Sequence, residues 1–378
     1  MNQKHVVLLK SRISNLGGLE KYAARIASGF LEKGCKVSLL TSGSPRPLLD
    51  SIEVHAAKTC RWPGFWRMEQ YDRFTREWLR NHPADILFGM DRNRLQTHMR
   101  AGNGVHAAFL KSRILTQGRM KWLVCQANPL HRKVLQLEKS GFESPTLQKL
   151  YTNSQMVKRE ILQHYRTDPA KIEVVHNGVE WKEMQSDFDA WGSEKPLAAK
   201  RLGLDPSLFH FLFIGNGYLR KGLGQLLKAL ASLQRKDVFL SVIGKDNRIE
   251  EYRMLASKLK LGAQVAFFGS QKEIRPFYQM ADALAIPSFY DPFANVTVEA
   301  LAMGLFVVSS KTNGGHEVLN AENGAVIDNL LDIDSIAAAL SSAIDRPKTI
   351  ESARRIRNSV QPLDFSNQIP LIIDSCLC

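Results

Sequence analysis

The sequence has 378 residues, which is too long for one compact core and predicts two domains of about 180 residues each. Its 44% hydrophobic and 23% charged residues are typical of a globular protein and exclude a disordered chain. The formal net charge of +14 predicts a polyanionic partner, which means nucleic acid, anionic lipid or a phosphorylated substrate.

The cysteines and the apolar runs bear on where the protein works. The five cysteines form neither a CxxC pair nor a disulfide framework, so we expect free thiols in a reducing compartment. The opening apolar run, 6–9, is too short for a signal peptide. The longest uncharged apolar stretch, 300–308, is about half of what a bilayer crossing needs. We therefore expect a soluble, cytoplasmic protein.

The chain begins with a strand–helix–strand pattern. Residues 5–9 predict a buried strand, a helix follows the glycine pair at 17–18, and residues 36–40 predict the next strand. The helix is indicated by apolar residues at helical spacing, namely Leu19, Tyr22, Ala23, Ile26, Ala27 and Phe30. Residues 171–176 predict the last strand of this half.

The second half repeats the alternation of strands and helices. An apolar stripe over 223–233 predicts a helix. The predicted strands span residues 209–214, 238–243, 265–268, 283–286 and 306–309. Such alternation predicts an α/β fold of two Rossmann-like domains, each with a parallel sheet covered by helices, that face each other across a cleft. Ligands bind such sheets at the carboxyl ends of the strands.

The domain boundaries follow from a polar stretch near the middle of the chain. Residues 181–204 are polar and weakly periodic, which indicates a linker. This linker separates a first domain, residues 1–180, from a second domain, residues 205–354. The C-terminal residues, about 355–378, are expected to form a helix that joins the first domain.

Positive charge is concentrated between Asp91 and Glu138, where nine basic residues occur and no acidic one. The basic residues are interleaved with apolar ones, which favours a surface for an anionic membrane or acceptor. The residues assigned to this surface are Lys111, Arg113, Arg119, Lys121, Trp122, Arg132 and Lys133. A plain solvated face is the alternative. No RNP, KH, zinc-finger or helix-turn-helix signature accompanies the charge, so no nucleic-acid partner is expected.

Two loops are candidate phosphate-binding sites. Gly17 and Gly18 end the loop after the first predicted strand, where backbone amides at a helix N-terminus could approach an anion, although a plain turn would look the same. The loop 215–222 places Arg220 and Lys221 at the carboxyl end of a strand. A guanidinium fork and an ammonium would bind phosphate oxygens there, unless both are simply solvated.

Asp291 and Glu299 are candidate functional carboxylates. A helix is expected to begin near Asn295, so Asp291 would precede it and Glu299 would lie one turn inside. One carboxylate would then reach into the cleft, while the other accepts hydrogen bonds from a hydroxyl-rich ligand. Alternatively, Asp291 caps the helix and Glu299 is solvated.

The motifs that carry a family resemblance are Gly17-Gly18-Leu19-Glu20, Gly104-Val105-His106, Asn153-Ser154, Asn177-Gly178-Val179, Arg220-Lys221-Gly222, and Asp291 followed after seven residues by Glu299 and then by Gly304. Together they resemble the retaining glycosyltransferases of the two-Rossmann-domain (GT-B) kind in family four, over nearly the whole chain. The stretches 102–111 and 290–296 further resemble bacterial enzymes that add sugars to the lipopolysaccharide core.

The resemblance implies roles for the phosphate-loop residues and for one carboxylate. Arg220 and Lys221 would bind the diphosphate of a nucleotide-sugar donor, and Glu299 would bind its ribose hydroxyls. Gly17 and Gly18 would close over the phosphates from the other domain.

The resemblance also implies two catalytic residues. His106 matches the family histidine near the donor sugar. Asp291 stands where the family usually has Glu, and the shorter side chain withdraws the carboxylate from the sugar. The donor-binding set further includes Phe293, Ala294, Asn295 and Val296. Phe306 replaces the usual proline, a packing difference without expected effect on chemistry.

The resemblance thus implies a retaining glycosyltransferase that moves a sugar from a nucleoside diphosphate, with UDP favoured, to a lipopolysaccharide-core or related glycolipid at the inner face of the plasma membrane. No metal or other cofactor is expected. The two DxD sequences, 187–189 and 332–334, would lie in the linker and at a helix start rather than at a metal site. A sugar-nucleotide epimerase of the same fold and a non-enzymatic module that binds anionic lipid or nucleic acid are the alternatives.

Overall fold

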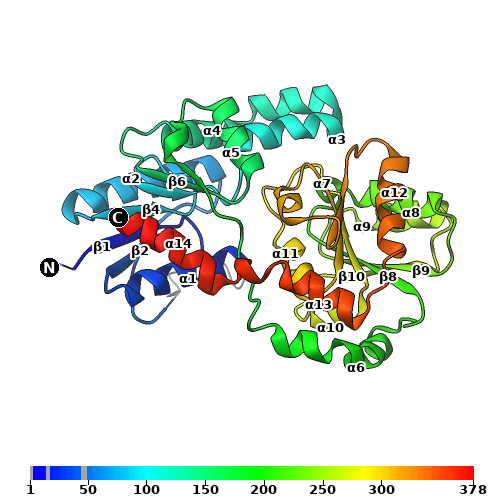
Figure 1. Cartoon of the computed structure of the whole chain (residues 1–378). Helices are drawn as coiled ribbons and strands as arrows, with labels where there is room; N and C mark the ends of the chain where they lie inside the picture. The colour runs from blue at the N-terminus through cyan, green and yellow to red at the C-terminus, as the bar shows by residue number, and fades with distance from the viewer. Residues whose placement is uncertain (1–2, 14–17, 44–48) are drawn as a thin grey trace. The chain divides into compact units, whose positions relative to one another are not determined.

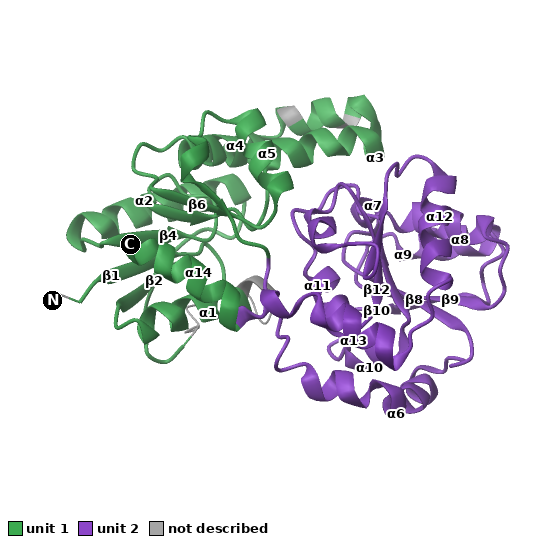
Figure 2. Cartoon of the chain, in the orientation of Figure 1, with its two compact units in different colours: residues 1–176, 366–378 green, residues 177–365 purple. Residues whose placement is uncertain are grey.

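The computed structural model describes residues 3–13, 18–43 and 49–378. The chain forms two compact units, with residues 1–176 and 366–378 in unit 1 and residues 177–365 in unit 2 (Figure 2). The chain passes from unit 1 to unit 2 after residue 176, close to the expected 180, and returns after residue 365, about ten residues later than the expected 355. No helix in the described ranges is both long and apolar enough to cross a bilayer.

Unit 1 is built on a seven-stranded sheet of order β3-β2-β1-β4-β5-β6-β7, and all its neighbouring strands are parallel. The strands are β1 (His5–Leu9), β2 (Lys36–Ser42), β3 (Glu53–Ala57), β4 (Ile86–Gly89), β5 (His98–Arg100), β6 (Lys149–Thr152) and β7 (Ile172–Val174). In the register of the sheet, Val6 on β1 lies between Val37 and Ile86. Residues 6–9 are fully buried, as expected for a parallel strand covered on both faces.

The helices of unit 1 are α1 (Gly18–Glu32), α2 (Gly64–Asn81), α3 (His106–Ala127), α4 (Pro129–Phe142), α5 (Gln155–His164) and α14 (Phe365–Leu377), and η1 (Pro169–Lys171) is a 3-10 turn. The described part of the predicted apolar stripe on α1, from Tyr22 to Phe30, is buried.

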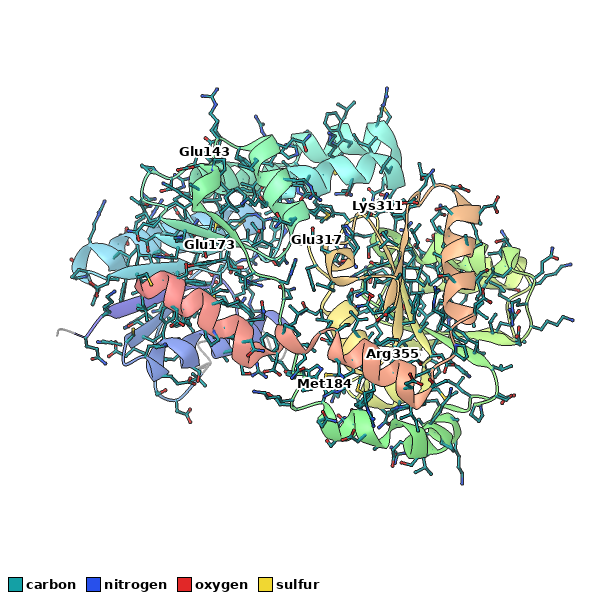
Figure 3. All side chains as sticks on the ribbon, in the orientation of Figure 1. Glu143, Glu173, Met184, Lys311, Glu317 and Arg355 are labelled. Carbon is teal, nitrogen blue, oxygen red and sulfur yellow. The ribbon has the colours of Figure 1, made fainter. Side chains whose placement is uncertain are left out.

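The C-terminal helix α14 returns to unit 1 and runs alongside α1 (Figure 1). Gly29 lets the two helices approach closely, since a Cβ there would lie 3.0 Å from Cγ1 of Ile373. Ser375 also donates a hydrogen bond of 3.0 Å to Glu173 on β7, the glutamate labelled in Figure 3. The segment before α14 differs from the expectation, because α13 (Ile350–Asn358) belongs to unit 2.

Unit 2 is built on a six-stranded parallel sheet of order β10-β9-β8-β11-β12-β13. The strands are β8 (Phe209–Ile214), β9 (Val238–Ile243), β10 (Val265–Gly269), β11 (Ala283–Ile286), β12 (Phe306–Ser310) and β13 (Gly324–Ile327). The helices besides α13 are α6 (Gln185–Leu202), α7 (Tyr218–Lys221), α8 (Leu223–Ser232), α9 (Ile249–Lys258), α10 (Arg275–Met280), α11 (Asn295–Ala302) and α12 (Ile333–Ile344), and the 3-10 turns are η2 (Gly314–Val318) and η3 (Gln361–Leu363). Both halves of the predicted α/β, Rossmann-like fold are therefore confirmed.

The segment expected to be a linker, 181–204, instead contains α6 and belongs to unit 2. Its buried side chains are Phe188, Ala198 and Ala199, so the apolar face is sparse and gives little periodic signal. The helix ends at Gly203, whose positive φ of 66° forms a left-handed C-cap.

Candidate active site

Arg220 and Lys221 share one carboxylate at the carboxyl end of β8. Both residues lie on α7, which follows that strand. Nη1 of Arg220 lies 2.9 Å and Nζ of Lys221 lies 2.6 Å from Oδ2 of Asp291. Nη1 of Arg220 also donates to the carbonyl of Tyr290 at 2.8 Å. The structure therefore brings Asp291 together with the two cations of the loop 215–222, which the sequence singled out separately from it.

The electrostatics of this trio favour an anion. Burial lowers the pKa of Lys221, while the charge of Asp291 opposes that shift. Burial alone would raise the pKa of Asp291, but the charges of Lys221 and Arg220 outweigh it and the pKa is lowered. The carboxylate is thus held ionised, and two cations facing one anion leave a net positive charge. Such a surplus at a strand end is suited to bind a diphosphate.

The turn after α7 requires glycine. Gly222 has a φ of 76°, and a Cβ there would lie 1.9 Å from the carbonyl oxygen of Pro287. This close approach brings the α7 loop against the segment that follows β11. The backbone N–H of Phe289 accordingly donates to the carbonyl of Arg220 at 2.8 Å.

The loop from Asp291 to the start of α11 is fixed by Asn313, a fully buried residue that sequence reasoning missed. Oδ1 of Asn313 accepts from the N–H groups of Ala294 at 3.0 Å and Gly315 at 3.1 Å. Its Nδ2 donates to Oγ of Ser309 at 2.9 Å. A turn signal was present in the sequence, because Asn313 precedes two glycines. Nothing in that signal indicated its partner 19 residues upstream.

The predicted donor-binding residues Phe293, Ala294, Asn295 and Val296 meet at the N-terminus of α11. The N-cap is Ala294, whose methyl side chain cannot accept a hydrogen bond, so the alternative that Asp291 is the cap is wrong. Phe293 and Ala294 are buried. The first backbone N–H groups of a helix have no partner within it, and the helix dipole there favours negative charge.

Asn177 supplies a further contact to the same loop. Its Nδ2 donates to Oδ1 of Asn295 at 2.6 Å and to the carbonyl of Phe293 at 3.3 Å. Asn177 is the first residue of unit 2 and belongs to the Asn-Gly-Val motif noted in the sequence. The motif therefore helps to hold the start of α11.

Glu299 lies within α11 and is half-buried. Its Oε2 accepts a hydrogen bond of 2.7 Å from the hydroxyl of Tyr278 on α10. The alternative of a solvated helix residue is therefore wrong. Sequence reasoning did not identify Tyr278, because a tyrosine in an apolar helix gives no indication of its partner.

His106 lies in unit 1 as the first residue of α3. Its backbone N–H donates to both carboxylate oxygens of Glu138, at 2.8 and 2.9 Å. Its Nε2 lies 3.0 Å from Nδ1 of His131. Burial, reinforced by the charge of Arg92, lowers the pKa of His106 to about 4. The imidazole is therefore neutral near pH 7.

Some predicted site residues lie wholly or partly outside the described residues. Gly17 is one of them. Gly18 is described only as the first residue of α1. Lys121 lies in α3, but its side chain is outside the described residues.

Only part of the predicted basic surface on α3 and α4 is exposed to solvent. Lys111, Arg119 and Arg132 are exposed, whereas Trp122 and Arg113 are half-buried. The exposed large apolar side chains on these two helices, within the described residues, are Leu115, Met120, Leu123, Val124 and Leu130. The assignment of Lys133 is wrong, because its ammonium is ion-paired with Glu69 and its side chain is 12% exposed.

Helices α3 and α4 pack against each other and extend as a projection beyond the strands of unit 1 (Figure 1). Gly118 has φ 81° and ψ 166°, which breaks the helix in two. The chain then folds back toward the start of α3, because His131 on α4 lies against His106 although 25 residues separate them.

The DxD sequences have ordinary structural partners. Asp187 pairs with Arg275 at 3.0 Å, and Asp332 caps α12 by accepting from the N–H of Asp334. Within the described ranges, no group of His, Cys, Asp and Glu side chains is arranged to hold a metal ion.

Comparison with known proteins relates both halves of the chain to glycosyltransferases. The family described as Glycosyltransferase Family 4 matches residues 16–182. The family described as Glycosyl transferases group 1 matches residues 195–361.

Individual relatives cover most of the chain. The chain is 24% identical over 315 residues to the lipopolysaccharide glucosyltransferase WaaG of Escherichia coli (strain K12), covering 82% of each protein. It is 26% identical over 337 residues to the uncharacterized glycosyltransferase MJ1607 of Methanocaldococcus jannaschii, covering 85% of this chain and 84% of that protein.

Solved structures share the fold over the whole length. The crystal structure of WaaG, a glycosyltransferase involved in lipopolysaccharide biosynthesis, matches with a TM-score of 0.79 and 20% identity, covering 98% of this chain and 99% of that one. The structure of Anabaena HepE in complex with UDP matches with a TM-score of 0.71 and 18% identity, covering 99% of each. These likenesses confirm the two-domain GT-B fold.

Proposed function

Because the chain belongs to the GT-B glycosyltransferases, with a family 4 domain followed by a group 1 domain, we propose that it transfers a sugar from a nucleoside-diphosphate donor to a glycolipid with retention of configuration. The observation that carries the proposal is the pair of cations, Arg220 and Lys221, held by one buried carboxylate beside a helix N-terminus. We favour UDP as the nucleotide, in line with the UDP bound to the similarly folded HepE.

The proposed chemistry places the cations where charge develops. When the bond between the anomeric carbon and the phosphate breaks, negative charge builds on the leaving diphosphate. Arg220, Lys221 and the amides at the start of α11 would stabilise that charge without a metal ion. The acceptor hydroxyl would attack the face that the diphosphate leaves, form the new glycosidic bond and give its proton to a diphosphate oxygen.

His106 and Asp291 have different roles in this proposal. Asp291 orients the two cations rather than contacting the sugar, which accounts for a side chain shorter than the family's glutamate. His106 would contact the donor sugar as a neutral hydrogen-bonding group, because its lowered pKa keeps it uncharged.

We propose a lipopolysaccharide-core or related glycolipid as the acceptor. The support is the similarity to a lipopolysaccharide glucosyltransferase and the projecting, basic and apolar surface of α3. Such a surface suits reversible binding to the anionic inner face of the plasma membrane from the cytoplasm.

The test has a binding step and a transfer step. Thermal unfolding is measured with UDP, GDP and ADP, because a ligand that binds only the native state raises the midpoint. Transfer from UDP-glucose to lipopolysaccharide with a truncated core is then followed for the wild type and Arg220→Ala. Arg354→Ala, an exposed arginine in the same unit, is the matched control.

The expected result is stabilisation by one nucleotide, and a transfer rate that Arg220→Ala lowers on the order of 10²-fold or more while Arg354→Ala leaves it unchanged. Conversion of the nucleotide-sugar without any acceptor would indicate an epimerase instead. Absence of both nucleotide binding and transfer would overturn the proposal.

A further inference from the structure

Tyr278 places a buried phenol against a carboxylate on the neighbouring helix. Its hydroxyl on α10 donates to Oε2 of Glu299 on α11 at 2.7 Å. The side chain is only 3% exposed and lies in the main hydrophobic core of unit 2. The N–H of Tyr278 also donates to the carbonyl of Ile274 at the start of α10. The phenol oxygen is therefore held in place by its own packing.

We propose that Tyr278 is a positioning residue that orients the carboxylate of Glu299 toward the two hydroxyls of the donor ribose, and so makes the site selective for ribonucleotides. The inference rests on the proposed function, in which Glu299 binds the ribose. It adds to that function a positioning residue that neither the fold nor the comparisons assign.

The direction of the hydrogen bond supports an orienting role. An ionised carboxylate accepts about four hydrogen bonds, so the bond from the phenol constrains its plane without using all of its acceptor capacity. A glutamate has three side-chain torsions, and an unanchored carboxylate would lose that freedom only when ligand binds. Tyr278 orders the group beforehand, which is the general way in which a rigid site gains affinity.

The chemistry of the phenol keeps the bond in one direction. Burial, with the charge of Glu299 added, raises the pKa of Tyr278 well above its ordinary value. The phenol is therefore protonated and remains the donor throughout the neutral range. Because Tyr278 is enclosed in the core, its contribution to nucleotide binding would act through Glu299 alone.

Tyr278→Phe tests the proposal, because it removes the hydroxyl and keeps the ring. Binding of UDP and of 2′,3′-dideoxy-UDP is measured by calorimetry. We expect the Kd for UDP to rise about tenfold, as for the loss of a hydrogen bond to a charged group. The Kd for the dideoxy nucleotide should be unchanged, because the contact being oriented is absent from that ligand.

Tyr71→Phe is the matched control. The Tyr71 phenol is also buried and donates to the carbonyl of Leu40 at 2.8 Å, but it lies in unit 1. Both variants should lose stability, and only Tyr278→Phe should lose affinity for UDP. An equal loss of affinity for both nucleotides in Tyr278→Phe would mean a general structural effect and would overturn the proposal.

A double-mutant cycle with Glu299→Ala separates this inference from the proposed function. Once Glu299 is removed, Tyr278→Phe should have no further effect on the Kd for UDP. If Glu299→Ala weakens binding but Tyr278→Phe does not, the positioning role fails while the donor site stands. If the wild type binds no nucleoside diphosphate, the proposed function itself fails.

Discussion

Asp291 is the residue that holds the two cations of the proposed donor site together. Its carboxylate is buried and contacts both cations. Removing its charge would leave Lys221 and Arg220 repelling each other, with Lys221 in a buried site that disfavours an unpaired charge. The carboxylate therefore links the stability of the loop to its function.

Asp291→Asn is expected to lower turnover on the order of 10²-fold, the effect of losing one preorganised stabilising group, whereas Asp291→Glu should retain more activity. Since the pKa of Asp291 is lowered in the fold, its contribution to stability is present above pH 3.8 and is lost as the pH falls through the lowered value. The Asn variant should therefore lose less stability than the wild type as the pH falls below 3.8. Steady-state rates and acid titrations check both, and an Asn variant with the wild-type rate would remove the carboxylate from the mechanism.

Arg220→Ala and Lys221→Ala are each expected to reduce turnover on the order of 10²-fold or more. Arg220 is half-exposed, so its loss should leave stability almost unchanged. Lys221 is buried, and its loss should also destabilise the fold because Asp291 keeps only one partner. Turnover rates and denaturant midpoints are measured for both variants. Equal midpoints for Arg220→Ala and Lys221→Ala would contradict the burial of Lys221.

His106→Asn is expected to lower turnover more than donor affinity. The pKa of His106 falls from 6.5 to about 4 on folding, so the unfolded chain binds more protons between these values. His106 therefore lowers the free energy of unfolding as the pH drops from about 6.5 to 4. The free energy of unfolding of His106→Asn should decrease less over the same range. Denaturant titrations at pH 4.5 and 7 measure the difference, and parallel curves for both proteins would mean that His106 is not held neutral.

At the scale of elements, the site depends on two loops that only the fold brings together. Residues 291–296 follow β11, and Asn313 follows the neighbouring strand β12. Asp291 and Thr312 are joined by a backbone hydrogen bond of 2.9 Å, and the carbonyl of Asp291 accepts from Gly314 at 2.9 Å. The start of α11 is thus positioned by a neighbouring loop rather than by a side-chain cap.

Asn313→Ala is expected to cost about 2 kcal/mol of unfolding free energy, because the buried N–H groups of Ala294 and Gly315 lose their acceptor. Affinity for the nucleotide should fall as well, since the same loop carries the first turn of α11. Asn320→Ala, in the more exposed turn nearby, is the control and should affect stability alone. Unchanged nucleotide affinity in the Asn313 variant would show that the loop holds its shape without the amide.

The elements also show what could be predicted from the sequence. The bounds of β8, β9 and β11 match the predicted 209–214, 238–243 and 283–286, because buried parallel strands are continuous apolar runs. The candidate site residues were found where charged residues follow such runs. Tyr278 and Asn313 were not, because their partners lie on other elements and local sequence gives no sign of them.

The projection formed by α3 is expected to determine binding to membranes. Vesicle sedimentation compares the wild type with a variant in which Lys111, Arg119 and Arg132 are changed to Ser. Each cation near an anionic surface contributes about 1 kcal/mol, so the variant should bind anionic vesicles on the order of 10²-fold more weakly, and added salt should remove most of the difference. Lys133→Ser is not suited to this set, because it breaks the ion pair with Glu69. Equal binding to neutral and anionic vesicles would contradict the prediction.

At the scale of the whole molecule, we expect a lysine outside the proposed donor site to reduce stability near neutral pH. Lys348 precedes α13, and its ammonium lies 4.3 Å from the ring centre of Trp191 on α6. In the described part of the chain this ammonium is buried without a hydrogen-bond partner. Asp282, whose negative charge acts on this ammonium, is already bound to Lys195 at 2.9 Å and to the N–H of His210 at 2.8 Å.

Burial lowers the pKa of Lys348 to about 7, against an ordinary 10.5. Between these values the unfolded chain binds more protons than the folded one, so this residue makes stability rise with pH from about 7 to 10.5. Below pH 7 the amine is charged in both states and the cost of burying it is fully present. Lys348→Met keeps the apolar contact with Trp191 and removes that cost.

We expect Lys348→Met to be more stable than the wild type at pH 6.5, by about 2 kcal/mol, the cost of burying an unpaired polar group. This difference in the free energy of unfolding should narrow as the pH rises toward 10, where the lysine of the folded wild type is neutral. Lys228→Met, on α8 of the same unit and exposed, controls for the loss of a positive charge. Denaturant midpoints at pH 6.5, 8 and 9.5 measure the gap, and a difference that does not vary with pH would mean that Lys348 stays charged in the folded protein.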